Sequence, residues 1–353
     1  ILNSLASLLA DLPAAHFIAR KGFTHSMSLA GGLLFIYITL LLLAGSNPML
    51  LIPAALVGGF CTAPYWLPYH TLFSVDGKKD AFAREVGWVG IISQLCAAAG
   101  PLIGGLVISF WGFSALYFVS LILVFLSLIT LLFFPDHPKP EAPKVSDLCC
   151  YAKSDDGRKW FLTFWLAIFE QDTLAIVWPV FVFAAVGSYE TVGGIASASL
   201  LVSLILLFVS GQLADRLGRN RILKYGSLGT AISWLILGSA RGGGAIFGFS
   251  ALLKSARTFL SVPLDAYTYE RASKGWAFKF LTFREMALHS GSFILLLILL
   301  IIWKLDFPPA VYFFPAIFGS FGIFLLSGHF GDFGEKLGER LRRFISRVRS
   351  ISD

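Results

Sequence analysis

The stretch GQLADRLGRNR, residues 211–221, stands where two apolar segments of the chain meet, at 191–213 and 221–240. Glycines allow the backbone to turn tightly and helices to approach closely. An aspartate among arginines can form charged contacts at a site that opens and closes. A basic loop alone would not require this order of residues, so the stretch stands out from an ordinary polar turn.

The rest of the chain is too apolar for a soluble protein of its length. Of its 353 residues, 56% are hydrophobic and 14% are charged, whereas soluble proteins contain about 25% charged residues. A helix needs about 20 residues to cross a bilayer. Charges and clusters of Gly, Pro and Asn divide the chain into eleven predicted spans: 1–19, 26–45, 49–75, 84–110, 113–134, 159–187, 191–213, 221–240, 244–271, 276–303 and 308–328. These spans predict an all-α polytopic membrane protein.

The basic residues predict how the chain lies in the membrane. They gather in every second turn and in the C-terminal tail, whereas the alternate turns contain only Arg241 and Lys304. Because cytoplasmic loops carry an excess of Lys and Arg, we expect a multi-pass protein of the plasma (inner) membrane with a cytoplasmic C-terminus. Residue 1 then lies outside, which predicts that a further span precedes it. The net charge of +7 sits beside the bilayer, so lipid and not nucleic acid is the expected partner.

The polar segments divide the spans into two halves. Residues 136–158 are rich in proline and mixed charges, and this composition favours an extended, solvated cytoplasmic linker. We therefore expect an N-terminal bundle at 1–135 and a C-terminal six-helix bundle at 159–328. The tail 329–353 places apolar residues at spacings of three and four between arginines, which indicates an amphipathic helix on the inner leaflet. A solvated, frayed tail is the alternative.

The stretch 211–221, which joins two predicted spans, resembles the loop signature of the major facilitator superfamily. The resemblance implies a gating role for this loop and its first copy, with the residues Gly211, Asp215, Arg216, Gly218, Arg219, Arg221, Arg20 and Gly22. A weaker copy, DLPAAHFIARKG at residues 11–22, aligns Gly22 with Gly218 and keeps Arg20, although Ala19 replaces the acid. In this family the signature follows the second and the eighth of twelve spans, so the resemblance implies that the first span is missing. It also implies two pseudo-symmetric bundles, with 11 of 12 helices present and a substrate cavity at their interface.

A second motif lies in the predicted span 84–110. Its small residues and proline are similar to the signature of drug and proton antiporters, with Cys96 in place of a usual glycine. The matching positions are Gly87, Gly100, Pro101, Gly104 and Gly105. This resemblance implies antiport and efflux. Plain close packing of helices in lipid is the alternative explanation of the same residues.

Ionisable residues inside a membrane are costly, so they are the default candidates for function. Helical spacing places one polar stripe on the segment 244–271, and Glu170 is preferred to Asp172 in the segment 159–187. Two prolines accompany aromatic residues in the segment 49–75. The resulting substrate or ion pathway comprises Lys254, Arg257, Ser261, Asp265, Glu170, Trp66, Tyr69 and His70. We interpret Asp11, Arg284, Glu285 and His289 as internal structural pairs.

The leading functional hypothesis is secondary active transport of a small solute by alternating access. We expect proton coupling through a buried carboxylate such as Glu170. For Lys254 and Arg257 two alternatives remain: they form an ion network with Glu170, or they bind an anionic substrate. A transporter-like sensor or partner-binding membrane protein is the alternative. The sequence contains no nucleophile motif and no metal-ligand cluster, so we do not expect an enzyme, a cofactor or a bound metal. We expect the protein to be a monomer.

Overall fold

The chain is helical throughout its described part. The computed structural model describes the backbone of residues 1–75, 82–135 and 137–328, and the side chains in these ranges except those of 75, 82–91, 208 and 210–216. No strand occurs within these ranges, in which nine helical stretches are long and apolar enough to cross a membrane. The protein is therefore an all-α, multi-pass membrane protein, as predicted.

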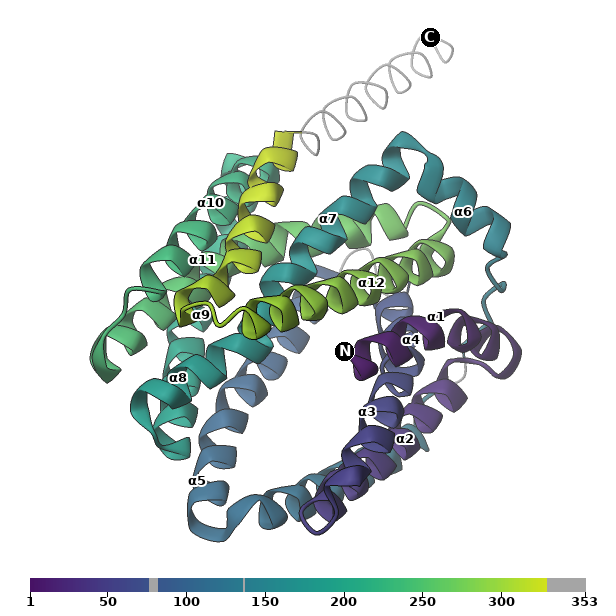
Figure 1. Ribbon diagram of the computed structural model, residues 1–353. Helices are drawn as coiled ribbons and strands as arrows, with labels where there is room; N and C mark the ends of the chain where they lie inside the picture. The colour runs from purple at the N-terminus through teal and green to yellow at the C-terminus, as the bar shows by residue number, and fades with distance from the viewer. Residues whose placement is uncertain (76–81, 136, 329–353) are drawn as a thin grey trace.

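The eleven predicted spans fall on helices of the structure (Figure 1): one of the nine stretches contains two spans, and the span 221–240 falls on a helix that is not among the nine. The elements are α1 (Leu2–Lys21), α2 (Phe23–Ala44), η1 (Pro48–Leu50), α3 (Leu51–Phe60), α4 (Thr62–Val75), α5 (Phe82–Leu131), α6 (Val145–Lys153), α7 (Asp155–Asp172), η2 (Thr173–Val177), α8 (Trp178–Val186), α9 (Tyr189–Leu217), α10 (Arg219–Leu237), α11 (Gly242–Ala272), α12 (Ala277–Lys304), η3 (Pro309–Phe313) and a final helix described from 314 to 328. The element α5 contains two predicted spans. Gly112, with φ 79° and ψ 177°, breaks the helix between them and turns the chain back.

We call α1–α5 the first half of the molecule and the helices from α7 to residue 328 the second half. Glycines allow close approach of helices within each half. In the first half, a Cβ on Gly59 would lie 2.3 Å from the backbone oxygen of Asn3, so α3 touches α1 directly. In the second half, a Cβ on Gly319 would lie 2.4 Å from the oxygen of Leu166, so the final helix packs equally closely on α7.

The turns α1–α2 and α9–α10 have the same construction. Gly22 separates α1 from α2 with φ 94°, and Gly218 separates α9 from α10 with φ 90°. L-residues with a side chain rarely adopt such angles, so both turns require glycine. The two positions that the sequence alignment paired are thus equivalent in backbone geometry.

The linker differs from the prediction of an extended, solvated segment. Residues 137–144 are non-helical, but α6 forms at Val145–Lys153 and α7 begins at Asp155, four residues before the predicted bundle boundary. The helix forms because Leu148 is buried against aromatic residues of the second half. The hydroxyl of Tyr151 donates to Asp156 at 2.9 Å, and burial raises the pKa of Tyr151, so this donor persists at neutral pH.

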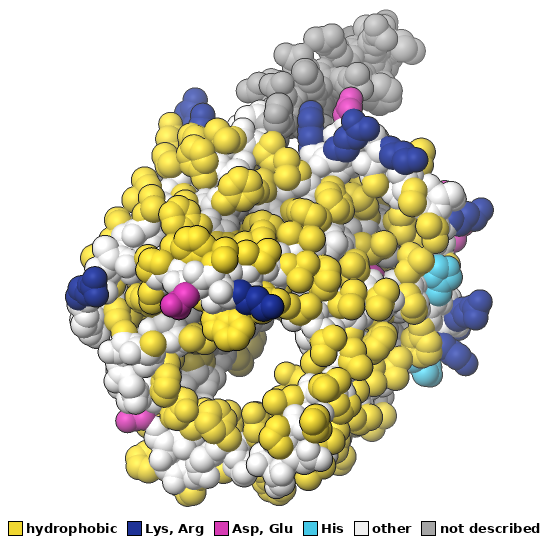
Figure 2. All heavy atoms as spheres, viewed as in Figure 1, with side chains coloured by type: hydrophobic (Ala, Val, Ile, Leu, Met, Phe, Trp, Pro, Cys, Tyr) yellow, Lys and Arg dark blue, Asp and Glu magenta, His cyan; other side chains and the backbone are white. Residues whose placement is uncertain are grey.

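Basic side chains gather at one end of the molecule, which we call the basic end. It carries the turns α1–α2, α9–α10 and α11–α12 and the helix α6. In Figure 2, Lys and Arg side chains lie mainly along the upper and right edges, and a hollow opens below between α5 and α3. The predicted amphipathic tail at 329–353 and the loop 76–81 lie outside the described residues.

The two halves meet along two antiparallel helix pairs. In the pair α5–α9, the Leu102 amide donates to Ser197 at 3.0 Å, and the Ser109 hydroxyl donates to the Glu190 carboxylate near the end opposite the basic loops. In the pair α1–α12, Ser4 and Ser292 lie 3.0 Å apart through their hydroxyl oxygens.

Candidate functional site

A buried ion pair joins α7 and α11 inside the second half. Arg257 Nε lies 2.9 Å from Glu170 Oε2, and the Glu170 side chain is only 2% exposed. The other oxygen, Oε1, has no hydrogen-bond partner among the described residues. Of the ion network expected for Lys254 and Arg257 with Glu170, the structure therefore contains the Arg257–Glu170 pair alone, and this pair lies within one half.

Lys254 lies one turn away from Arg257 on α11 but has different neighbours. Its ammonium donates to the backbone oxygen of Ala196 on α9 at 2.9 Å and lies 4.4 Å from the centre of the Trp178 ring. Lys254 is 7% exposed, and it lines a cavity of about 460 Å³ between α5, η2, α8, α9 and α11. The two cations of the polar stripe on α11 therefore lie in different environments, because Arg257 contacts α7 and Lys254 contacts α9.

The remaining members of this stripe continue toward the basic end. Ser261 is half-buried and Asp265 is exposed, whereas Thr258 and Thr268 donate to backbone oxygens of their own helix. Both threonines are buried, and each of these hydrogen bonds stays within α11. Tyr269, one turn beyond Asp265, was missed in the sequence analysis, although extending the same stripe by four residues would have found it.

Aromatic residues of α4 meet α11 across the two halves. His70 Nδ1 lies 2.7 Å from the Tyr269 hydroxyl, and the ring of Phe73 lies 4.8 Å from that of Tyr269. Trp66 stacks on His70 with ring centres 5.5 Å apart, and Tyr69 packs edge-on against both. These rings close the interface near the basic end.

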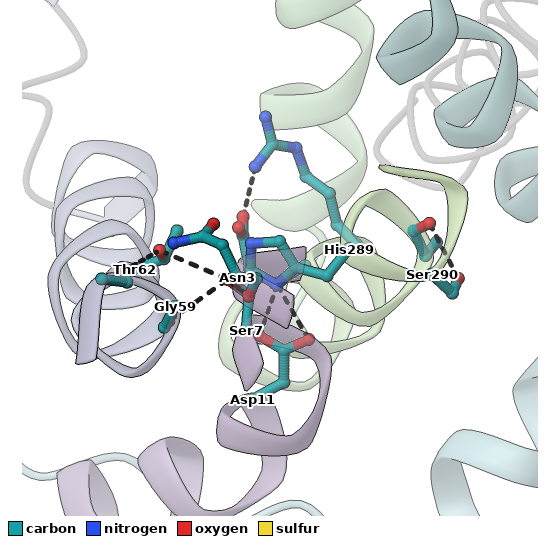
Figure 3. A network of polar contacts seen from close by, with 11 residues as sticks. Asn3, Ser7, Asp11, Gly59, Thr62, His289 and Ser290 are labelled. Atoms are coloured by element: carbon teal, nitrogen blue, oxygen red, sulfur yellow. Dashed lines mark hydrogen bonds and ion pairs between the residues drawn. The ribbon is translucent and has the colours of Figure 1, made fainter. Parts of the chain in front are cut away.

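A second polar group crosses the halves between α1 and α12. Figure 3 shows Asp11 and His289 pointing toward one another, with His289 Nδ1 at 2.9 and 3.0 Å from the two carboxylate oxygens. The Asp11 side chain is 1% exposed. Nearby, the Ser292 hydroxyl donates to Asp172 at 2.6 Å. Among the residues for which we expected internal structural pairs, Asp11 and His289 therefore form a pair that links the two halves.

The same close view contains a polar seam within the first half. Asn3 and Ser7 on α1 face Gly59 and Thr62 in Figure 3. The Ser7 hydroxyl donates to the Gly59 oxygen at 3.2 Å, and the Asn3 amide donates to the Ala55 oxygen at 3.2 Å. These bonds hold α1 on α3 and so position Asp11 one turn further along α1.

Arg284 and Glu285 form an ion pair of adjacent residues on α12, and Glu285 is 3% exposed. Both were interpreted from sequence as structural. They lie one turn from His289 on the same helix, so the interface between the halves holds several charged groups close together.

The predicted gating loop is described only in part. The side chains of Gly211, Asp215 and Arg216 lie outside the described residues, as do those of Arg84 and Gly87. Arg219 does form a contact, since its guanidinium lies 3.1 Å from Glu270 at the end of α11. The contact of Asp215 with the start of α5 that the resemblance suggests stays a prediction.

The antiporter-like residues of α5 pack against α9. A Cβ on Gly105 would lie 2.6 Å from the Tyr189 backbone oxygen, and a Cβ on Gly193 would lie 2.2 Å from the Pro101 oxygen. The helices can approach this closely only because neither position carries a side chain. Gly104 and Pro101 also line the cavity that contains Lys254, and Gly100 has open space around it.

Comparisons with known proteins agree with the helical arrangement. Residues 1–148 match the model of the Major Facilitator Superfamily. The structure is similar to the E. coli fucose:proton symporter FucP, with a TM-score of 0.65 and 14% sequence identity, over 93% of this chain and 90% of that chain. It is also similar to FucP in the outward conformation, with a TM-score of 0.66 and 14% identity, over 93% of this chain and 89% of that chain.

These comparisons bear on the expectations in different ways. The similar structures include a symporter, so they do not support the expected antiport and efflux. The comparison with curated proteins found no match. The chain has the fold of the major facilitator superfamily, and its first 148 residues match that family in sequence.

Proposed function

We propose that the protein is a secondary transporter that moves a small solute by alternating access. The observation that carries this proposal is the interface between the halves, where titratable pairs meet inside the apolar region. Asp11 pairs with His289 and His70 pairs with Tyr269, and each pair has one member in each half. Such pairs break when the halves rock apart, so their making and breaking can couple ion binding to a change of access.

We further propose that the transport is coupled to protons and that Asp11 and His289 carry the coupling. Both groups titrate, and they lie in contact across the interface, whereas Glu170 contacts an arginine of its own half. Loss or gain of a proton changes the charge of the Asp11–His289 pair and hence the attraction between α1 and α12. Asp172 and Glu285 lie beside this pair and add to its electrostatic environment.

The direction of transport does not follow from the motif on α5. Close packing against α9 accounts for Gly105, so the presence of this glycine does not require antiport. A symport and an antiport mechanism use the same interface and differ in which loaded states can reorient. We therefore propose proton-coupled transport and let the experiment determine whether solute and proton move in the same direction.

Uptake into proteoliposomes tests the proposal. The protein is reconstituted, and accumulation of solutes from a broad panel is measured with and without a pH gradient. A gradient of one sign should drive accumulation of at least one solute, and Asp11→Asn should retain exchange of that solute but lose gradient-driven accumulation. Asp306→Asn is the matched control, because Asp306 lies in the turn after α12 at the end opposite the basic loops.

Two outcomes would contradict the proposal. If folded protein moves no solute of the panel, a transporter-like sensor becomes the better reading. If Asp11→Asn accumulates solute like the unmodified protein, the coupling does not depend on the Asp11–His289 pair.

A further inference from the structure

We propose that the cavity beside Lys254 binds an amphipathic organic anion, a carboxylate on a compact apolar body. This inference deepens the proposed transport function and rests on it for the role of the ligand as substrate. The cavity is about 460 Å³, which falls in the range of small-molecule sites, about 300–1,000 Å³.

The charge of Lys254 is not balanced by any acidic side chain in the part of the protein that the structure describes. Among the described side chains, no Asp or Glu lies within ion-pair distance of its ammonium, and the nearby Arg257 is paired with Glu170. The ammonium has three donors, of which one is used by the Ala196 oxygen. The Ala196 oxygen and the Trp178 ring carry no net charge, so a negative group in the cavity would complete the environment of this buried cation.

The aromatic partner of Lys254 is held in place before any ligand binds. The Trp178 indole donates from Nε1 to the Ser250 hydroxyl at 3.0 Å, and both residues are buried. Trp178 follows η2, a π-helical turn, and such turns are frequent at functional sites. The ring therefore fixes the ammonium on one side and leaves its other donors for a ligand.

The walls of the cavity determine the rest of the ligand. They are mostly apolar, with Leu174, Pro179 and Leu200 from the second half and Ile108 from α5. Apolar walls around a single cation favour a ligand with one anionic group and disfavour sugars or zwitterions, whose polar groups would stay unpaired. Because α5 belongs to the first half, a bound ligand would contact both halves, as a transported substrate must.

The first experiment compares two ligands of the same shape. Binding of 2-naphthoate and of the neutral 2-naphthamide to the purified full chain is measured by calorimetry in detergent, without any gradient. The charged ligand should bind at least about tenfold more tightly, the effect expected of a charge-assisted hydrogen bond. Equal affinities of the two ligands, or no binding of either, would overturn the proposal.

The second experiment assigns the difference to Lys254. Lys254→Gln should lose about tenfold or more in affinity for 2-naphthoate and leave binding of 2-naphthamide unchanged. Lys224→Gln is the matched control, because Lys224 also lies over an aromatic ring, 5.3 Å from the centre of Phe324, but outside the cavity. An equal loss in both variants would reject the site.

The comparison of the two ligands uses the unmodified protein, so it tests the anion site even if Lys254→Gln fails to fold. Binding without uptake in proteoliposomes would support the site and overturn the transport function. Uptake of other solutes without binding of 2-naphthoate would overturn the site alone.

Discussion

At the scale of single residues, the Arg257–Glu170 pair is the clearest case of mutual dependence. Arg257→Met leaves the Glu170 carboxylate buried without its cation, and breaking a buried pair costs about 3–5 kcal/mol. We expect a strongly reduced folded yield and thermal stability, measured by size-exclusion chromatography and thermal unfolding. Combining Arg257→Met with Glu170→Gln should restore most of the loss, because no buried charge remains.

The pair Arg219–Glu270 provides the control for this prediction. The guanidinium and the carboxylate lie 3.1 Å apart, and each side chain is 42% exposed. Exposed ion pairs contribute about 0–1 kcal/mol to stability. Arg219→Met should therefore change stability little. If Arg257→Met were equally mild, Arg257 would be free to bind substrate, the other alternative that the sequence left open.

The sequence predicted which residues of α11 are polar inside the membrane, but not what they contact. Helical spacing places Lys254 and Arg257 on one side of a helix without naming the helix that faces them. Arg257 meets a carboxylate, whereas Lys254 meets the backbone oxygen of Ala196, a group that every residue carries. Such a partner has no signature in the sequence, so the separation of the two cations became visible only in the structure.

At the scale of elements, α5 and α9 depend on their closest contact. A Cβ on Gly193 would lie 2.2 Å from the Pro101 oxygen, a backbone atom that can move only with its helix. Gly193→Ala should therefore separate α5 from α9, lower thermal stability by several degrees and reduce transport. On the same helix, Gly194 has nothing within 4 Å of an added Cβ, so Gly194→Ala should be neutral or slightly stabilising. Equal effects of the two variants would show that the contact is dispensable.

The element boundaries show where composition is a good guide and where packing overrides it. The predicted span 244–271 became α11 at Gly242–Ala272, because polar turns bound it on both sides. The linker was predicted as one extended segment because prolines dominate its composition. The last of these prolines is Pro143, and the residues after it form α6, whose Leu148 is buried against the second half at a packing place that the linker does not itself contain. That place is a tertiary feature, so a local reading could not supply it.

At the scale of the whole molecule, the fold class followed from the apolar spans, whereas the conformation did not. The halves touch near the basic end through His70 and Tyr269, and the Lys254 cavity lies toward the other end, beside Tyr189. Under the proposed alternating access, one sequence supports both an inward and an outward state, so its pattern cannot select between them. The spans are common to both states and were therefore predictable.

The orientation in the membrane is the last prediction, and native cysteines can test it. Cys149 and Cys150 are exposed on α6 at the basic end, which we expect to be cytoplasmic because basic loops stay inside. In a Cys61→Ser, Cys96→Ser background, a membrane-impermeant maleimide should label them only after the cells are permeabilised. Ser46→Cys is the control, because the exposed turn after α2 lies at the opposite end and should be labelled in intact cells. The reverse pattern would place the basic end outside, and the Lys254 cavity would then lie toward the cytoplasm.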